Sequence, residues 1–193
     1  MKYLFSALLL VCSFLASAQS DSTYINSPVF LQLGVGIFPN IGNLKGEISA
    51  AVGYRFNQYV GLGAEYRSSS THNESFGTSA KGVGLHLRGQ NRRGWLAGLG
   101  GGKVLSGFQG SDNIDSQQYR TGGYYYAADV GYQFRWGGTL GLFATAVKDM
   151  TFDGYLYNND TNVDEPTGTS RLEEFGSFGV KFGFAFPWRG KRR

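Results

Sequence analysis

Large apolar residues recur at every second position through most of the chain. Near the C-terminus, every second residue from Phe178 to Phe186 is Phe or Val, and the residues between them are glycine, lysine or alanine. A period of two is typical of a β-strand with two unlike faces. No helical period of 3.6 competes with this pattern after residue 18. The alternation predicts eight strands, at residues 28–38, 45–56, 59–69, 78–88, 94–105, 122–136, 139–150 and 174–187.

The lengths of these segments and of their connections fit a membrane barrel. Most segments are long enough to cross a membrane when tilted, which takes about 9–11 residues, whereas strands of soluble proteins have about 5–6. Three connections are short, namely Asn57-Gln58, "GQNRRG" and Gly137-Gly138. The connections on the other side include "SSTHNESFG", "GFQGSDNIDSQQYRT" and "TFDGYLYNNDTNVDEPTGTSRLE". Short turns on one side and longer loops on the other are the layout of outer-membrane barrels.

Most predicted strands have one face of large apolar residues and a second face of the residues between them. The composition of this second face decides which of the two meets lipid. That face holds mostly Gly, Ala and Ser, whereas a face exposed to water would carry many Lys, Glu, Thr and Ser residues. Small residues suit the narrow interior of a barrel of about eight strands, and in hydrocarbon a sheet must close so that every backbone group is paired. The sequence therefore predicts an all-β fold, an eight-stranded antiparallel up-and-down transmembrane β-barrel. The orientation of segments 94–105 and 139–150 stays open, because both of their faces contain apolar residues.

Charged residues of both signs are interspersed along the small-residue face. We expect them to pair inside the barrel and stiffen it, because an unpaired buried charge is costly. A proton or ion path, or a gate, is the alternative role for the same residues. The predicted lumen network consists of Glu47, Arg55, Glu65, Arg67, His86, Arg88, Asp129, Arg135 and Lys181.

Aromatic residues gather near both ends of the predicted strands, as they do at the two interfaces of a membrane. The expected girdle on the periplasmic side consists of Phe56, Tyr59, Trp95, Phe134, Trp136, Phe186 and Trp188. The expected girdle at the opposite ends consists of Tyr66, Phe76, Phe108, Tyr119, Tyr124, Tyr155, Tyr157 and Phe175.

The first eighteen residues have the layout of a secretory signal peptide. Lys2 precedes an apolar run that ends at Leu15, and Ala16-Ser17-Ala18 forms the expected cleavage site. Cleavage would remove Cys12, the only cysteine, so the mature protein could form no disulfide. We therefore expect a signal peptide at 1–18, a periplasmic leader at 19–27, the transmembrane barrel at 28–187 and a basic periplasmic tail at 188–193.

Little in the sequence favours catalysis or nucleic-acid binding. The formal net charge is only +4, and Lys2 of the signal peptide contributes one of these charges. His72 lies near Glu74 and Ser75 in a predicted loop, but sequence neighbours in a loop do not form a positioned catalytic triad. We predict no catalytic residue, no cofactor and no nucleic-acid partner.

The last long loop is rich in oxygen donors at Asp160, Asn162, Asp164 and Glu165. An EF-hand loop needs Gly at its sixth position and Glu at its twelfth, where this loop has Glu165 and Arg171. We therefore predict no metal site.

The chain resembles a known family. Gln19 directly after the signal peptide, the hairpin "YRFNQYVGLGAEY" and the final "FGVKFGFAF" are similar to the small outer-membrane β-barrel (porin-family-like) proteins of Gram-negative bacteria, especially those of the Bacteroidetes type. The resemblance covers essentially the whole mature chain. It implies outer-membrane lipids as partners, and recognition of Phe182, Phe184 and Phe186 by the barrel-assembly machinery. In the family the chain usually stops at the last aromatic residue, whereas here "PWRGKRR" follows.

These observations favour an integral outer-membrane protein with a structural or surface-interaction role and no open aqueous pore. Three alternatives stay open: a lipid A-modifying barrel enzyme, a narrow ion or small-solute channel, and a soluble periplasmic ligand-binding barrel.

Overall fold

The structure is a computed structural model that describes residues 28–40, 43–57, 59–73, 76–110, 115–158 and 163–186. Within these ranges no helix is both long and apolar enough to cross a membrane. The strands are β1 (Val29–Asn40), β2 (Asn43–Arg55), β3 (Val60–Asn73), β4 (Phe76–Gln90), β5 (Trp95–Gly110), β6 (Asp115–Gln133), β7 (Gly138–Asn158) and β8 (Val163–Phe186). The predicted signal peptide, leader and basic tail lie outside the described residues.

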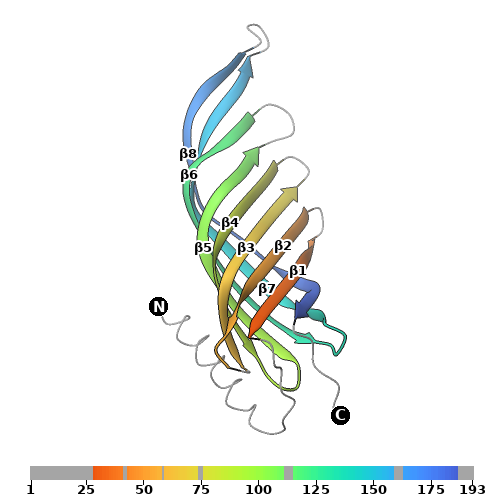
Figure 1. The fold of residues 1–193 in the computed structure, drawn as a ribbon. Helices are drawn as coiled ribbons and strands as arrows, with labels where there is room; N and C mark the ends of the chain where they lie inside the picture. Colours follow the sequence, from red (N-terminus) through yellow and green to blue (C-terminus); the bar gives the residue numbers. More distant parts are fainter. Residues whose placement is uncertain are drawn as a thin grey trace.

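The eight strands form one closed barrel in which each strand pairs antiparallel with the next along the chain. β1 and β8 close it, from Leu31 opposite Phe186 to Ile37 opposite Val180. Figure 1 shows the strands running obliquely around the barrel. The predicted fold class, an eight-stranded antiparallel up-and-down barrel, is confirmed.

The short connections lie where the sequence predicts them, and asparagine side chains organise two of them. Asn57 Oδ1 accepts hydrogen bonds from the backbone N–H groups of Tyr59 and Val60, at 2.7 and 2.9 Å. Asn91 Oδ1 accepts them from Arg93 and Trp95 in the β4–β5 turn. Such side-chain bonds to nearby N–H groups favour tight turns. We call this end of the barrel the turn end and the opposite end the loop end.

The alternating large apolar residues of most strands face outward and the small ones face inward, as predicted. The exposed fractions of Ile48, Leu85 and Phe178 are 57%, 63% and 74%, while the adjacent Glu47 and His86 are each 1% exposed. The structure orients the two ambiguous segments: Leu96 and Val104 of β5 and Phe143 and Val147 of β7 point inward and are buried.

The predicted bounds are wrong at the loop end, where the last three strands are much longer than expected. β6, β7 and β8 have 19, 21 and 24 residues, compared with 12 and 13 for β1 and β2. Most of "TFDGYLYNNDTNVDEPTGTSRLE" is therefore paired strand and not loop, from Lys148 opposite Glu174 to Asn158 opposite Val163. Its polar residues suggest a loop, but strands that continue beyond lipid need no apolar face. We call this part of β7 and β8, residues 148–158 and 163–174, the tall hairpin. It rises above the other strands (Figure 1).

Irregularities in the strands fold apolar side chains into the loop end of the barrel. The pairing register shifts between Lys103 and Phe108 in β5, and Asp149 in β7 has a φ of 59°. Around these points the barrel holds an apolar cluster, which we call the upper cluster: Ala80, Val104, Tyr125, Ala127, Val147, Met150 and Phe152, with Tyr119, Leu172 and Phe175 packed against it. The prediction of Tyr119 and Phe175 as girdle residues is therefore wrong, because both pack against this interior cluster.

Candidate functional site: the charged interior of the barrel

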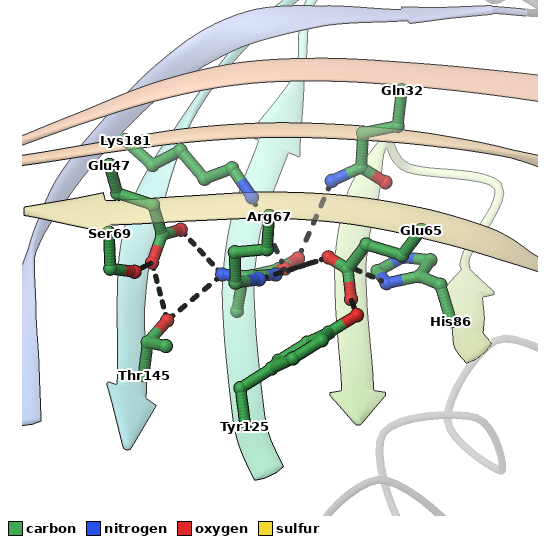
Figure 2. A network of polar contacts seen from close by, with 10 residues as sticks. Gln32, Glu47, Glu65, Arg67, Ser69, His86, Tyr125, Thr145 and Lys181 are labelled. Carbon is green, nitrogen blue, oxygen red and sulfur yellow. Dashed lines mark hydrogen bonds and ion pairs between the residues drawn. The ribbon is translucent and has the colours of Figure 1, made fainter. Parts of the chain in front are cut away.

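Arg67 lies at the centre of the barrel interior with its side chain 2% exposed. Its guanidinium group lies 2.5 Å from a carboxylate oxygen of Glu47, 2.5 Å from one of Glu65 and 3.6 Å from one of Asp129. It also donates a hydrogen bond of 3.0 Å to Thr145 Oγ1, and that hydroxyl donates in turn to Glu47. Four strands, β2, β3, β6 and β7, thus converge on one cation (Figure 2).

The strand geometry explains why these side chains meet. Glu65 and Arg67 are two residues apart on β3, so both point inward. On β2 the residue opposite Arg67 is Ser49, which places Glu47 diagonally beside it. Charges on diagonal positions of neighbouring strands are within reach of long side chains.

Glycines on the facing strands make room for this cluster. A Cβ added at Gly100 would collide with the Glu65 carboxylate, and one added at Gly98 would lie 2.5 Å from an oxygen of Asp129. The small residues of the inner face thus leave space for charged side chains that extend from nearby strands. A sheet that faced water would have no need of such small residues at these positions.

Asp129 and Glu65 each have further polar partners besides Arg67. Lys181 Nζ lies 3.4 Å from Asp129, and Gln32 donates to the other oxygen of that carboxylate at 3.5 Å. His86 Nδ1 lies 3.5 Å from Glu65, and the Tyr125 hydroxyl donates to Glu65 at 3.5 Å. We call the set the Arg67 cluster: Gln32, Glu47, Glu65, Arg67, Ser69, His86, Tyr125, Asp129, Thr145 and Lys181 (Figure 2).

A second polar layer lies at the turn end. Gln90 donates to Gln133 at 2.6 Å, and Gln133 donates to the backbone carbonyl of Ala185 at 2.6 Å. Arg88 donates to Gln90 at 3.0 Å, and its guanidinium group lies 5.3 Å from the centre of the Phe30 ring. All five residues are buried. We call this set the lower layer.

The structure places all but one of the predicted lumen charges inside the barrel. Glu47, Arg55, Glu65, Arg67, His86, Arg88 and Lys181 are buried, and the Asp129 side chain is 7% exposed. Arg135 is the exception: it is exposed in the β6–β7 turn, so its assignment to the lumen is wrong. The alternation of β6 ends at Gln133, two residues earlier, where the chain leaves the sheet.

Several polar interior residues are absent from the predicted lumen network, because that set contains only charged residues and His86. Gln32, Gln133 and Tyr125 alternate with outward apolar residues, so their face could have identified them. Gln90 lies in "GQNRRG", which the sequence predicts to be a turn. Thr145 lies in a segment whose two faces both contain apolar residues, and the alternation gives no signal there.

The predicted periplasmic aromatics lie around the turn end. Phe56, Trp95, Phe134 and Trp136 are exposed on the outer wall, and Tyr59 and Phe186 are partly exposed. The rings of Phe134 and Trp136 are stacked with their centres 5.9 Å apart. Trp188 lies outside the described residues.

The interior position of His86 bears on the enzyme alternative. Its imidazole is 1% exposed and lies between Glu65 and the ring of Phe30, whose centre is 6.3 Å away. A lipid substrate on the outer wall could not reach it. Within the described ranges no group of three or more His, Cys, Asp or Glu residues could hold a metal ion, and Asp160 and Asn162 lie outside those ranges.

The closed ring, the outward apolar face and the buried charges inside it together define a small β-barrel of the outer-membrane type. Neisserial surface protein A (NspA) has a similar structure, with a TM-score of 0.51, 13% identity, and coverage of 82% of this chain and 97% of that one. The outer membrane protein OprG from Pseudomonas aeruginosa is also similar, with a TM-score of 0.52, 9% identity, and coverage of 83% and 96%.

These two likenesses establish the fold and agree with the predicted outer-membrane location. No family model matches the chain, and no curated protein matches it. The likeness to barrels of the Bacteroidetes type stays a prediction.

Replacing Arg67 with Met should strongly destabilise the barrel, by about 3–5 kcal/mol, because buried carboxylates would lose their cation. Lys148→Met is the matched control, since it also removes one cation from an ion pair, but that pair is exposed and its loss should cost at most about 1 kcal/mol. The free energy of unfolding, measured by urea titration of the barrel in lipid vesicles, gives both values. Equal losses for the two variants would contradict the central position assigned to Arg67.

Proposed function

We propose that the chain is an integral outer-membrane protein whose barrel carries no solute and whose tall hairpin acts at the cell surface. Its role is structural or interaction-based, and the barrel serves as a rigid anchor. Catalysis has no part in this proposal.

The proposal rests on three sets of side chains that occupy the interior one above another, from the turn end to the loop end. The lower layer joins β4, β6 and β8 through the chain from Gln90 to Gln133 to the carbonyl of Ala185. The Arg67 cluster fills the middle, and the upper cluster closes over it with Met150 and Phe152, both of which are 0% exposed. An ion would have to disrupt all three layers in order to pass.

The tall hairpin supports the surface role. Lys148 and Glu174 lie opposite each other and form an exposed ion pair, and from there β7 continues to Asn158. Ten residues of strand span about 33 Å. Exposed ion pairs follow this stretch, between Arg171 and Asp149 at 2.5 Å and between Arg120 and Asp153 at 3.3 Å. Charges of both signs are typical of a surface in water and are costly in contact with lipid.

Conductance measurements in planar bilayers distinguish the proposed closed barrel from the alternative of a narrow channel. Wild-type protein in planar bilayers should give flat traces, because the filled interior leaves no path for ions. Lys181→Gln, which removes one interior charge, should be equally flat. Discrete conductance steps in the wild type, with an ion selectivity that changes in Lys181→Gln, would show that ions cross the Arg67 cluster.

An epitope inserted between Asn158 and Val163 should be labelled by antibody on intact cells, because the tall hairpin is proposed to face the environment. The same epitope inserted between Gln90 and Trp95, at the turn end, is the control and should be labelled only after the outer membrane is permeabilised. The reverse pattern would contradict the proposed orientation.

A further inference from the structure

Two lysines lie side by side on the outer wall near the loop end. Lys103 of β5 pairs with Val83 of β4, and Lys81 lies two residues before Val83, just beyond a shift in the pairing register between Lys81 and Gly82. Both side chains are exposed on the outer wall. Residues related in this diagonal way have Cα atoms about 7–8 Å apart, and both lysine side chains can reach a common group.

This pair lies where the apolar wall ends. Below Lys81 the outward residues of β4 are Val83, Leu85 and Leu87. On β5, Trp95 marks the turn end, and the eight residues from there to Lys103 span about 26 Å of strand. Strands of such barrels are tilted by about 35–45°, so the height is about 20 Å, which is close to the apolar band of about 25 Å. The two ammonium groups therefore lie at the level of lipid headgroups.

Among the described residues of β3, β4 and β5, no carboxylate lies on this wall to balance the two charges. β4 and β5 contain no Asp or Glu, and the only one in β3 is Glu65, which points inward to Arg67. The neighbouring outward groups are hydroxyls instead: Ser68 and Ser106 both pair with Lys81, and Tyr124 pairs with Lys103. The next lysine along this row, Lys148, differs because it has Glu174 as its partner at 3.0 Å.

Two neighbouring cations without an acid repel each other unless an anion binds between them. An anion at this position must also tolerate the apolar wall directly below it, where Val83 and Leu85 are exposed. A phosphate group attached to acyl chains meets both conditions, because its chains can cover the wall while its oxygens accept hydrogen bonds from the lysines and hydroxyls.

We infer that Lys81 and Lys103, with Ser68, Ser106 and Tyr124, form a binding site for the phosphate group of an outer-leaflet lipid of the lipid A type. This site rests on the proposed membrane location, but not on the closed interior or on the role of the tall hairpin. It makes one side of the barrel, β3 to β6, the side that retains an anionic lipid.

The test compares wild type with Lys81→Gln/Lys103→Gln and with a control, Arg93→Gln/Arg135→Gln, which removes two exposed cations at the turn end. Each purified protein is mixed in detergent with diphosphoryl lipid A, and retained lipid is counted by native mass spectrometry. Parallel samples contain dephosphorylated lipid A or inorganic phosphate. The heat-dependent gel shift of a folded barrel is recorded for each protein.

Wild type and control should retain diphosphoryl lipid A equally, and the lysine variant about thirtyfold more weakly, since two contacts of a basic residue with an anionic lipid surface are lost. Dephosphorylated lipid A and inorganic phosphate should not be retained. Equal retention by the lysine variant, or equal retention of dephosphorylated lipid, would overturn the inference.

The heat-dependent gel shift distinguishes a wrong lipid-binding site from a wrong membrane assignment. A wild type that shows no folded barrel in detergent would contradict the membrane assignment itself. If the double variant does not fold, the single changes Lys81→Gln and Lys103→Gln decide, because each should weaken retention while Lys81→Arg/Lys103→Arg restores it.

Discussion

The ion cluster around Arg67 is the interaction on which the rest of the structure depends. A guanidinium group held by Glu47, Glu65 and Asp129, and supported by Thr145, ties β2, β3, β6 and β7 together across the interior. Each of these charges would be costly if it were left alone inside the barrel, so the cluster forms as a unit. The glycines of the inner face follow from it, because larger residues at Gly98 and Gly100 would occupy the space of Asp129 and Glu65.

The outer wall of the barrel faces lipid, not water. Apolar residues such as Ile48, Leu85 and Phe178 face lipid, while the Arg67 cluster is enclosed between the lower layer and the upper cluster. Beyond the apolar band the same strands change character. Lys81 and Lys103 appear on one side, and on the other side β7 and β8 continue as the tall hairpin with exposed ion pairs. The barrel thus has a buried, charged middle and two chemically distinct features at its loop end.

Much of this architecture could be predicted from the sequence, since a period of two fixes both the strand and its inward face. Glu65 and Arg67 were identified in this way, as were the outward residues of β1 and β2. Three features escaped. Arg135 continues the parity of β6, but the chain has already turned at that point. The tall hairpin has polar residues that look like a loop, because only lipid demands an apolar face. The upper cluster includes Met150 and Phe152, which point inward because the parity of β7 reverses at Asp149, where φ is 59°.

On β2 the large apolar residues face lipid, while the small and charged residues face the interior. The mature chain contains no cysteine if residues 1–18 are removed, so single cysteines can carry a spin label at successive positions of β2. Electron paramagnetic resonance in lipid vesicles then reports collisions with oxygen, which dissolves in lipid, and with a nickel chelate, which stays in water. The account predicts high oxygen and low nickel accessibility at Ile48, Val52 and Tyr54, and low accessibility to both at Ser49 and Ala51. Nickel accessibility at the second set, or oxygen accessibility that does not alternate, would contradict it.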